Sequence, residues 1–168
     1  LRKLCSVIFQ LPALFDSKNI FENISFGIRN LTFEEKLKRV RKSLEQVELT
    51  HFSEQMHNLK PGQLSYGEQK RLSIARSLIM NPEILLFDEP TTGIDPITSK
   101  NLHRLIRNLS VQLNKTSIIV SHDMKNALEF ADEIFILDQG HILEYGNPES
   151  LKQSQNDLTR NFLKDLVL

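Results

Sequence analysis

Apolar residues along this chain follow two patterns, short continuous runs and runs that recur every three or four residues. A compact apolar run followed by a breaker, as before Pro12, favours a buried strand over a helix. Strands are therefore expected at 4–9, 84–87, 117–120 and 134–137, with another around 142–145 after the turn at Gly140.

The three- and four-residue spacings predict helices between these strands. Thr32 and Glu35 form a capping box before a run whose apolar positions include Phe33 and Val40. A second helix should begin at Ser65 and end near Asn81-Pro82, because the residue before proline is pushed out of helical geometry. Further helices are expected at 97–113 and 124–130, with one or two amphipathic helices after Pro148 that include Leu166. The order strand, helix, strand, helix, strand in the middle of the chain is typical of parallel α/β units.

Composition narrows the class of protein. The 168 residues, 40% hydrophobic and 25% charged, are enough for one ordinary globular domain. The 21 basic and 21 acidic residues cancel, so no net field draws the chain to nucleic acid or to an anionic membrane. The run at 84–87 is far shorter than the roughly 20 apolar residues of a membrane-spanning helix, so a membrane role would act through a partner. Cys5 is expected to be a buried core residue that suits a reducing cytosol, and Leu1 suggests an internal start.

A basic cluster lies on the helix that follows Thr32. Acidic residues interrupt it and no aromatic residues interleave for base stacking, so a solvated helix face is favoured over a nucleic-acid site. The cluster comprises Lys36, Lys38, Arg39, Arg41 and Lys42.

Three short motifs could carry chemistry. Ser65 and Glu68 form a capping box with Gly67 between them, and a helix start offers unpaired N–H groups to an anion. Asp88 and Glu89 follow a buried strand, where one carboxylate could hold Mg²⁺ and the other could take a proton from water. Each motif also has a plain structural interpretation, a well-capped helix and an acidic loop respectively.

The third motif is Ser121-His122-Asp123, directly after the strand at 117–120. A single histidine at a strand end is more often a hydrogen-bonded surface residue than a catalytic one. If this strand neighbours the one at 84–87, His122 and Glu89 would project from the same sheet edge and could share one γ-phosphate.

In combination these motifs resemble the ATP-binding subunits of ABC transporters. The run 64–78 resembles the family's signature and its helix, and 84–88 with Glu89 resembles its Walker B strand and catalytic glutamate. The segment 92–96, which contains Asp95, is similar to the D-loop. His122 is similar to the switch histidine, and Gln10 to the glutamine of the Q-loop.

The resemblance implies a partial P-loop NTPase fold of class α/β, mainly a parallel sheet flanked by helices, with a helical subdomain. The helical and signature part would occupy about 20–80, the sheet core 1–19 and 81–146, and C-terminal helices 147–168. It also implies ATP and Mg²⁺ as ligands, and a cytoplasmic location on the inner face of the plasma membrane. The expected partners are a membrane permease, which docks near 20–63, and a second ATP-binding subunit in a homodimer, with no nucleic acid.

The family's pattern assigns roles to individual residues. In the head-to-tail dimer, Ser65 and Gly67 would contact a γ-phosphate held by the partner chain, beside Glu68, and Asp95 would link the two sites. Asp88 and Gln10 would serve Mg²⁺. Glu89 would act as general base, with Gln10 and His122 completing the catalytic set.

The sequence departs from the family in two respects. Its signature has Tyr66 in place of the first glycine and Glu68 in place of glutamine. No Gly-x-x-x-x-Gly-Lys-Ser/Thr occurs in the 168 residues, so the chain by itself is expected to be incomplete for catalysis.

The subfamily and the class of function are further predictions. The stretch 10–24 and Arg160-Asn161-Phe162-Leu163 resemble the ATPases of Mla-type phospholipid transport systems. Two alternatives stay open, a catalytically inactive module that binds a partner and a non-transport ABC protein. The latter usually carries tandem domains or a coiled coil, and no sustained heptads occur here.

Overall fold

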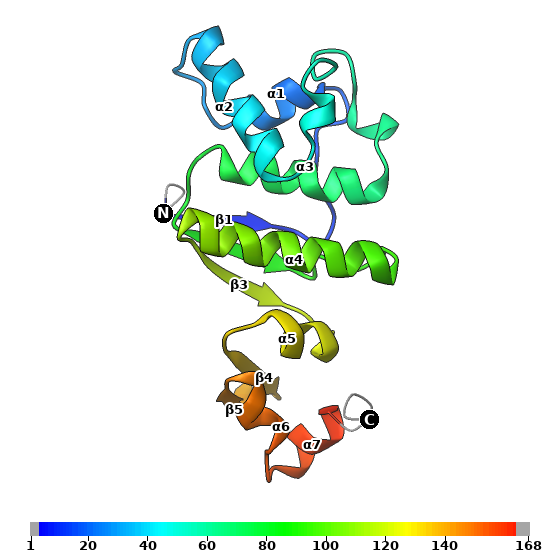
Figure 1. The fold of residues 1–168 in the computed structure, drawn as a ribbon, viewed down its shortest axis with the longest axis vertical. Coiled ribbons are helices and arrows are strands. Elements are labelled where there is room, and N and C mark those ends of the chain that lie inside the picture. Colours follow the sequence, from blue (N-terminus) through cyan, green and yellow to red (C-terminus); the bar gives the residue numbers. More distant parts are fainter. Residues whose placement is uncertain (1–3, 164–168) are drawn as a thin grey trace. The chain divides into compact units, whose positions relative to one another are not determined.

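The computed structural model describes residues 4–163, and the chain divides into two compact units between Val120 and Ser121. Figure 1 shows both units as ribbons. Within the described range, no helix is both long enough and apolar enough to cross a bilayer.

The first unit is built on a three-stranded parallel sheet in the order β1-β2-β3. The strands are β1 (Cys5–Ile8), β2 (Ile84–Asp88) and β3 (Thr116–Val120). Ile8 pairs with Phe87, and Asp88 pairs with Val120, so the carboxyl ends of all three strands lie along one edge. The predicted strands and the parallel α/β pattern are confirmed here.

Helices connect these strands, and those between β1 and β2 form a group beside the sheet (Figure 1). Those of the first unit are α1 (Ile20–Ser25), α2 (Phe33–Gln46), α3 (Tyr66–Leu78) and α4 (Pro96–Leu113), with short 3₁₀ turns η1 (Thr50–Phe52) and η2 (Pro61–Gln63). The predicted capping boxes at Thr32 and Ser65 are both present. The sequence analysis missed a third, in which Asn19 and Glu22 cap α1. Helix α3 packs against α1, α2 and β1, which joins the helical group to the sheet.

Apolar side chains from the sheet and the helices share one core in this unit. Leu85 and Phe87 of β2 are buried, as are Val40 and Leu44 of α2. Phe33 is 60% exposed, contrary to its expected place on the buried stripe, because it begins α2 and its ring lies at the margin against Phe21, 5.5 Å between centroids. The expected burial of Cys5 is also only partly correct, since its side chain is half-buried on the outer strand β1.

The second unit contains α5 (Met124–Phe130), β4 (Ile134–Asp138), β5 (His141–Gly146), α6 (Pro148–Lys152) and α7 (Asp157–Leu163). Strand β4 pairs antiparallel with β5, whereas the sequence pattern predicted the next member of a parallel series. The connecting residues Gln139 and Gly140 both have positive φ, 46° and 79°, which suits the tight primed turn of a hairpin. The expected C-terminal helices are confirmed by α6 and α7, and Leu166 lies outside the described residues.

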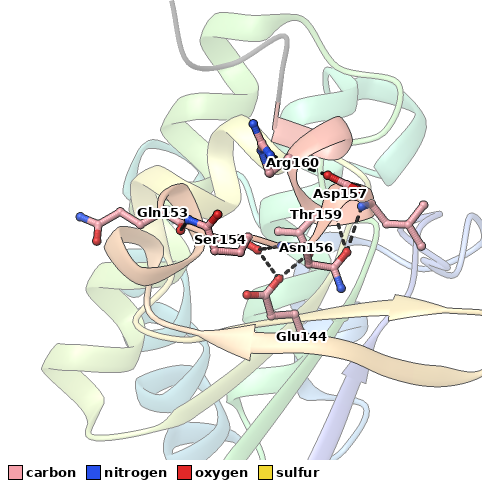
Figure 2. A network of polar contacts seen from close by, with 9 residues as sticks. Glu144, Gln153, Ser154, Asn156, Asp157, Thr159 and Arg160 are labelled. Carbon is pink, nitrogen blue, oxygen red and sulfur yellow. Dashed lines mark hydrogen bonds and ion pairs between the residues drawn. The ribbon is translucent and has the colours of Figure 1, made fainter.

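A carboxylate joins the hairpin to the C-terminal helices in this unit (Figure 2). Glu144 of β5 accepts hydrogen bonds from the hydroxyl groups of Ser154, at 2.7 Å, and Thr159, at 2.5 Å. These bonds, that from Thr159 first, hold the pKa of Glu144 below its ordinary value. The network fixes the turn between α6 and α7 on β5.

Candidate functional site

The carboxyl edge of the parallel sheet carries two adjacent acidic residues. Asp88 ends β2 with an exposed side chain, and Glu89 follows it half-buried. The backbone N–H of Glu89 donates to the carbonyl of Val120 at 2.9 Å, which continues the β2–β3 ladder one step beyond the strand. Both acidic residues therefore lie at a rigid strand end, the position where open α/β sheets bind ligands.

Glu89 has an unusual backbone. Its φ is 44°, in the left-handed region that non-glycine residues seldom occupy. Such a conformation costs about 1–3 kcal/mol and persists where the surrounding structure fixes it, often at functional sites. The hydroxyl of Thr92 donates to the Glu89 carboxylate at 3.2 Å, and the Thr92 N–H donates to the Glu89 carbonyl at 3.3 Å. A tight turn thus holds the carboxylate in one orientation.

Gln10 lies at the same sheet edge, just beyond the end of the neighbouring strand β1. It lies two residues beyond Ile8, whose partner in β2 is Phe87, so the backbone places Gln10 and Asp88 at the ends of adjacent strands. Both side chains are exposed, and the Gln10 carbonyl accepts a hydrogen bond from the ammonium of Lys70. The strand register therefore places Gln10 at the same sheet edge as Asp88 and Glu89.

The start of α3 has the capping geometry that its sequence predicted. The Ser65 N–H and hydroxyl both donate to Glu68, at 2.8 and 2.7 Å. Burial by itself would raise the pKa of Glu68, but these hydrogen bonds and the nearby His51 outweigh it and hold the pKa below its ordinary value. A Cβ on Gly67 would lie 3.0 Å from the Thr98 methyl, so the glycine also permits α3 to approach the start of α4.

Asp95 caps α4 and is exposed. Its carboxylate accepts from the N–H groups of Ile97 and Thr98, each at 3.0 Å, and these bonds, those of Thr98 first, lower its pKa. The preceding Gly93 has a φ of 82°, and a Cβ there would meet the Tyr66 ring at 3.4 Å. The turn that carries Asp95 therefore lies beside the start of α3.

His122 belongs to the second unit. Strands β2 and β3 are neighbours, which confirms the condition on which its expected place at the same sheet edge depended. Its side chain is exposed, and its backbone carbonyl accepts from the Met124 N–H at 3.1 Å.

The donor set at the sheet edge fits Mg²⁺ with a bound phosphate. Mg²⁺ prefers oxygen ligands, retains several waters and uses one or two carboxylates together with substrate phosphates. Asp88 and the Gln10 amide offer exposed oxygens at adjacent strand ends, as that mode of binding requires. No cluster of three acidic, histidine or cysteine side chains that could form an all-protein cage occurs in residues 4–163.

The sequence analysis missed two residues that organise this site. Thr92 was treated only as part of the D-loop-like segment, although its spacing of three from Glu89 is that of a turn hydrogen bond. The sequence pattern did not single out Lys70, yet this residue is only 1% exposed. No local signal marks its burial, because the groups that cover it come from distant parts of the chain.

Comparison with known proteins indicates the family of the chain. Residues 1–92 match the family model described as ABC transporter. The chain is 35% identical over 159 residues to a Fe(3+) ions import ATP-binding protein of Mannheimia succiniciproducens, covering 94% of this chain and 44% of that protein. It is 37% identical over 146 residues to a sulfate/thiosulfate import ATP-binding protein of Mesostigma viride, covering 86% and 41%. The chain spans less than half the length of these relatives.

Two solved structures share the fold. One is cbiO1 from Clostridium perfringens, part of the ABC transporter complex cbiONQ, with a TM-score of 0.82 and 29% identity over 98% of this chain and 65% of that one. The other is a dimeric ATP-binding cassette in a post-hydrolysis state with ADP and Pi, with a TM-score of 0.73 and 33% identity over 88% and 64%. Both likenesses confirm the expected partial P-loop NTPase fold.

The finer prediction of an Mla-type phospholipid ATPase is not supported, because these curated relatives are named for the import of iron and sulfate. The stretch 10–24 that suggested it contains residues with local structural duties, such as Asn19 and Glu22 in the cap of α1. Because the family model matches 92 of the 168 residues and similar proteins are 35–37% identical over most of the chain, the chain belongs to the ABC transporter family of ATP-binding proteins.

Proposed function

We propose that this chain supplies residues for ATP binding and hydrolysis in an ABC transporter that imports an inorganic ion or a small solute through a separate membrane subunit. The observation that carries the proposal is the Glu89 carboxylate, held at the end of β2 in a left-handed backbone and oriented by Thr92. The names of the similar proteins, which are ATP-binding subunits of importers, support the same reaction class.

Each residue of the candidate site is proposed to have its own role in hydrolysis. Glu89 accepts a proton from the attacking water, since its carboxylate is fixed beside the strand end where the phosphate is proposed to lie. Asp88 and Gln10 would hold Mg²⁺, and a bound Mg²⁺ would neutralise charge on the phosphate oxygens. His122 is proposed to contact the γ-phosphate.

Ser65 and Gly67 act on the nucleotide of a second copy. Their place at the start of α3, beside Glu68, presents helix N–H groups to a phosphate from outside the chain. Asp95 is proposed to link the two sites across a homodimer, and the dimeric state of the solved cassette supports this assembly. The helical part at about 20–80 is proposed to dock on the permease at the inner face of the membrane.

The proposal is tested with Glu89→Gln in the protein expressed from its complete reading frame. The amide retains the shape of the side chain but is not a base, so turnover should fall by about 10²–10⁴-fold while MgATP binding persists. Glu83→Gln is the matched control, because Glu83 is an exposed carboxylate just before the opposite end of β2. Near-normal ATP turnover by Glu89→Gln would refute the assigned role, and a wild-type protein that binds no ATP would refute the proposed function.

A further inference from the structure

Lys70 is a buried cation on the first turns of α3. Its side chain is 1% exposed, although lysine is almost never fully buried unless it is paired. The ammonium donates to the backbone carbonyl of Gln10, sixty residues away in the sequence, and lies 5.3 Å from the centroid of the Tyr66 ring. Burial lowers the pKa of Lys70. The partners of this charge are therefore one carbonyl and one aromatic face.

The choice of a cation at this position needs a reason. Removing an ammonium from water is expensive, and an apolar side chain of similar length would fill the same space without that cost. What an apolar side chain lacks is a donor for the Gln10 carbonyl. Lys70 thus holds the backbone of Gln10, the residue proposed as a ligand of Mg²⁺.

A second cation of α3 holds the same loop further along. The guanidinium of Arg76 donates to the carbonyl of Ala13 at 2.8 Å and lies 5.6 Å from the Phe15 ring centroid. Ala13 has a φ of 49°, a left-handed conformation that persists only where its surroundings determine it. Arg76 also donates to the carbonyl of Pro12 at 3.5 Å, so two charged donors of α3 fix the loop after β1 at three carbonyls.

Tyr66 extends these contacts to a third segment. The Lys70 ammonium lies near the Tyr66 ring. A Cβ atom added to Gly93 would be 3.4 Å from Cε1 of the same ring. The Gly93 turn also leads into Asp95. Lys70 therefore contacts the Gln10 loop and Tyr66 lies beside the Gly93 turn, both from a single turn of helix next to Ser65.

We propose that Lys70 is a positioning residue that makes the Gln10 loop and the Ser65 end of α3 move as one body, with Tyr66 extending this coupling to the Gly93 turn. This inference rests on the proposed function, because Gln10 and Ser65 are assigned there to two different nucleotides of a dimer. A shift of Gln10 at one nucleotide would then shift Ser65 at the other. The coupling is expected to act on the rate of hydrolysis rather than on ATP affinity, because the Lys70 side chain is buried and holds the Gln10 backbone instead of facing a ligand.

The experiment measures amide hydrogen exchange and ATP turnover in the protein expressed from its complete reading frame. In Lys70→Met, exchange of the amides at 13–15 should rise by about tenfold to 100-fold, the equivalent of one hydrogen bond to a charged group. The kcat should fall while KM for ATP stays close to that of the wild type. Lys70→Arg retains charged donors and should restore much of both properties. Lys42→Met is the control, because Lys42 is exposed on α2.

Each outcome decides the question. Unchanged exchange at 13–15 in Lys70→Met overturns the inference, whatever the ATPase result. Faster exchange with unchanged kcat also overturns it, because Lys70 would then serve the fold alone. If Lys70→Met does not fold, Lys70→Gln, which keeps a neutral donor, takes its place, with the same two readouts. A wild-type protein without ATPase activity refutes the proposed function instead, and the exchange data distinguish that case.

Discussion

Asn23 provides a test of how the loop after β1 is held. Its side chain is 0% exposed in α1. The oxygen Oδ1 accepts from the Phe15 N–H at 2.9 Å, and Nδ2 points at three carbonyls, those of Phe15 at 3.1 Å, Lys18 at 3.0 Å and Asn19 at 3.0 Å. Two amide protons serve these three carbonyls, so the side chain makes about three full hydrogen bonds.

Asn23→Ala removes all of them at once. At about 1 kcal/mol of net stability for each hydrogen bond, the free energy of unfolding should fall by about 3 kcal/mol. The backbone groups that bonded to Asn23 would then lack partners. Where water cannot reach them, they lower the free energy of unfolding further. For a chain of this size the same loss corresponds to a drop in melting temperature of about 6–12 °C.

The assay is urea unfolding followed by circular dichroism, with Asn30→Ala as the control, because Asn30 is an exposed asparagine of the same unit. The control should stay within about 0.5 kcal/mol of the wild type. Asn23→Asp should be as destabilising as Asn23→Ala at neutral pH, since a carboxylate would face three carbonyls. If Asn23→Ala matched the control, the reasoning that this side chain anchors the loop would be wrong.

Three further results are expected. Ser65→Ala removes the helix cap of α3 and should cost about 0.5–2 kcal/mol in urea unfolding, whereas Ser65→Thr should retain most of it; equal stabilities of all three proteins would contradict the capping role. Gly93→Ala places a Cβ at a φ of 82° and should cost about 1–2 kcal/mol, while Gly62→Ala, with open space around it, should be near neutral. Because the folded pKa of Glu144 is lowered from 4.5, its contribution to stability is present above that pH and is lost as pH falls through the lowered folded value. Stability of Glu144→Gln should therefore fall less steeply with acid, and a slope equal to that of the wild type would exclude this contribution.

Much of the secondary structure was predictable from local sequence. Period and capping chemistry act within a few residues, so the starts of α2 and α3 and the strand before Asp88 were predictable within one or two residues. The prediction failed where the pairing of a strand depends on its partner strand rather than on its own residues. Strand β4 has the apolar run of a parallel strand, yet the turn at Gln139 and Gly140 pairs it with β5.

The candidate site divides in the same way. The order of motifs indicated the family, and Gln10 became a candidate only through that resemblance. The strand end by itself indicated Asp88 and Glu89, because parallel strands have their carboxyl ends at one edge. The left-handed backbone of Glu89 and its bond from Thr92 belong to the folded turn.

What the sequence by itself determined about this protein is its set of elements and its family, since both depend on residues that are neighbours in the chain. Only the tertiary structure decided that Lys70 is buried against the Gln10 carbonyl. The reason is physical: the burial of a charge depends on every group that excludes water from it, and those groups converge from segments about sixty residues apart.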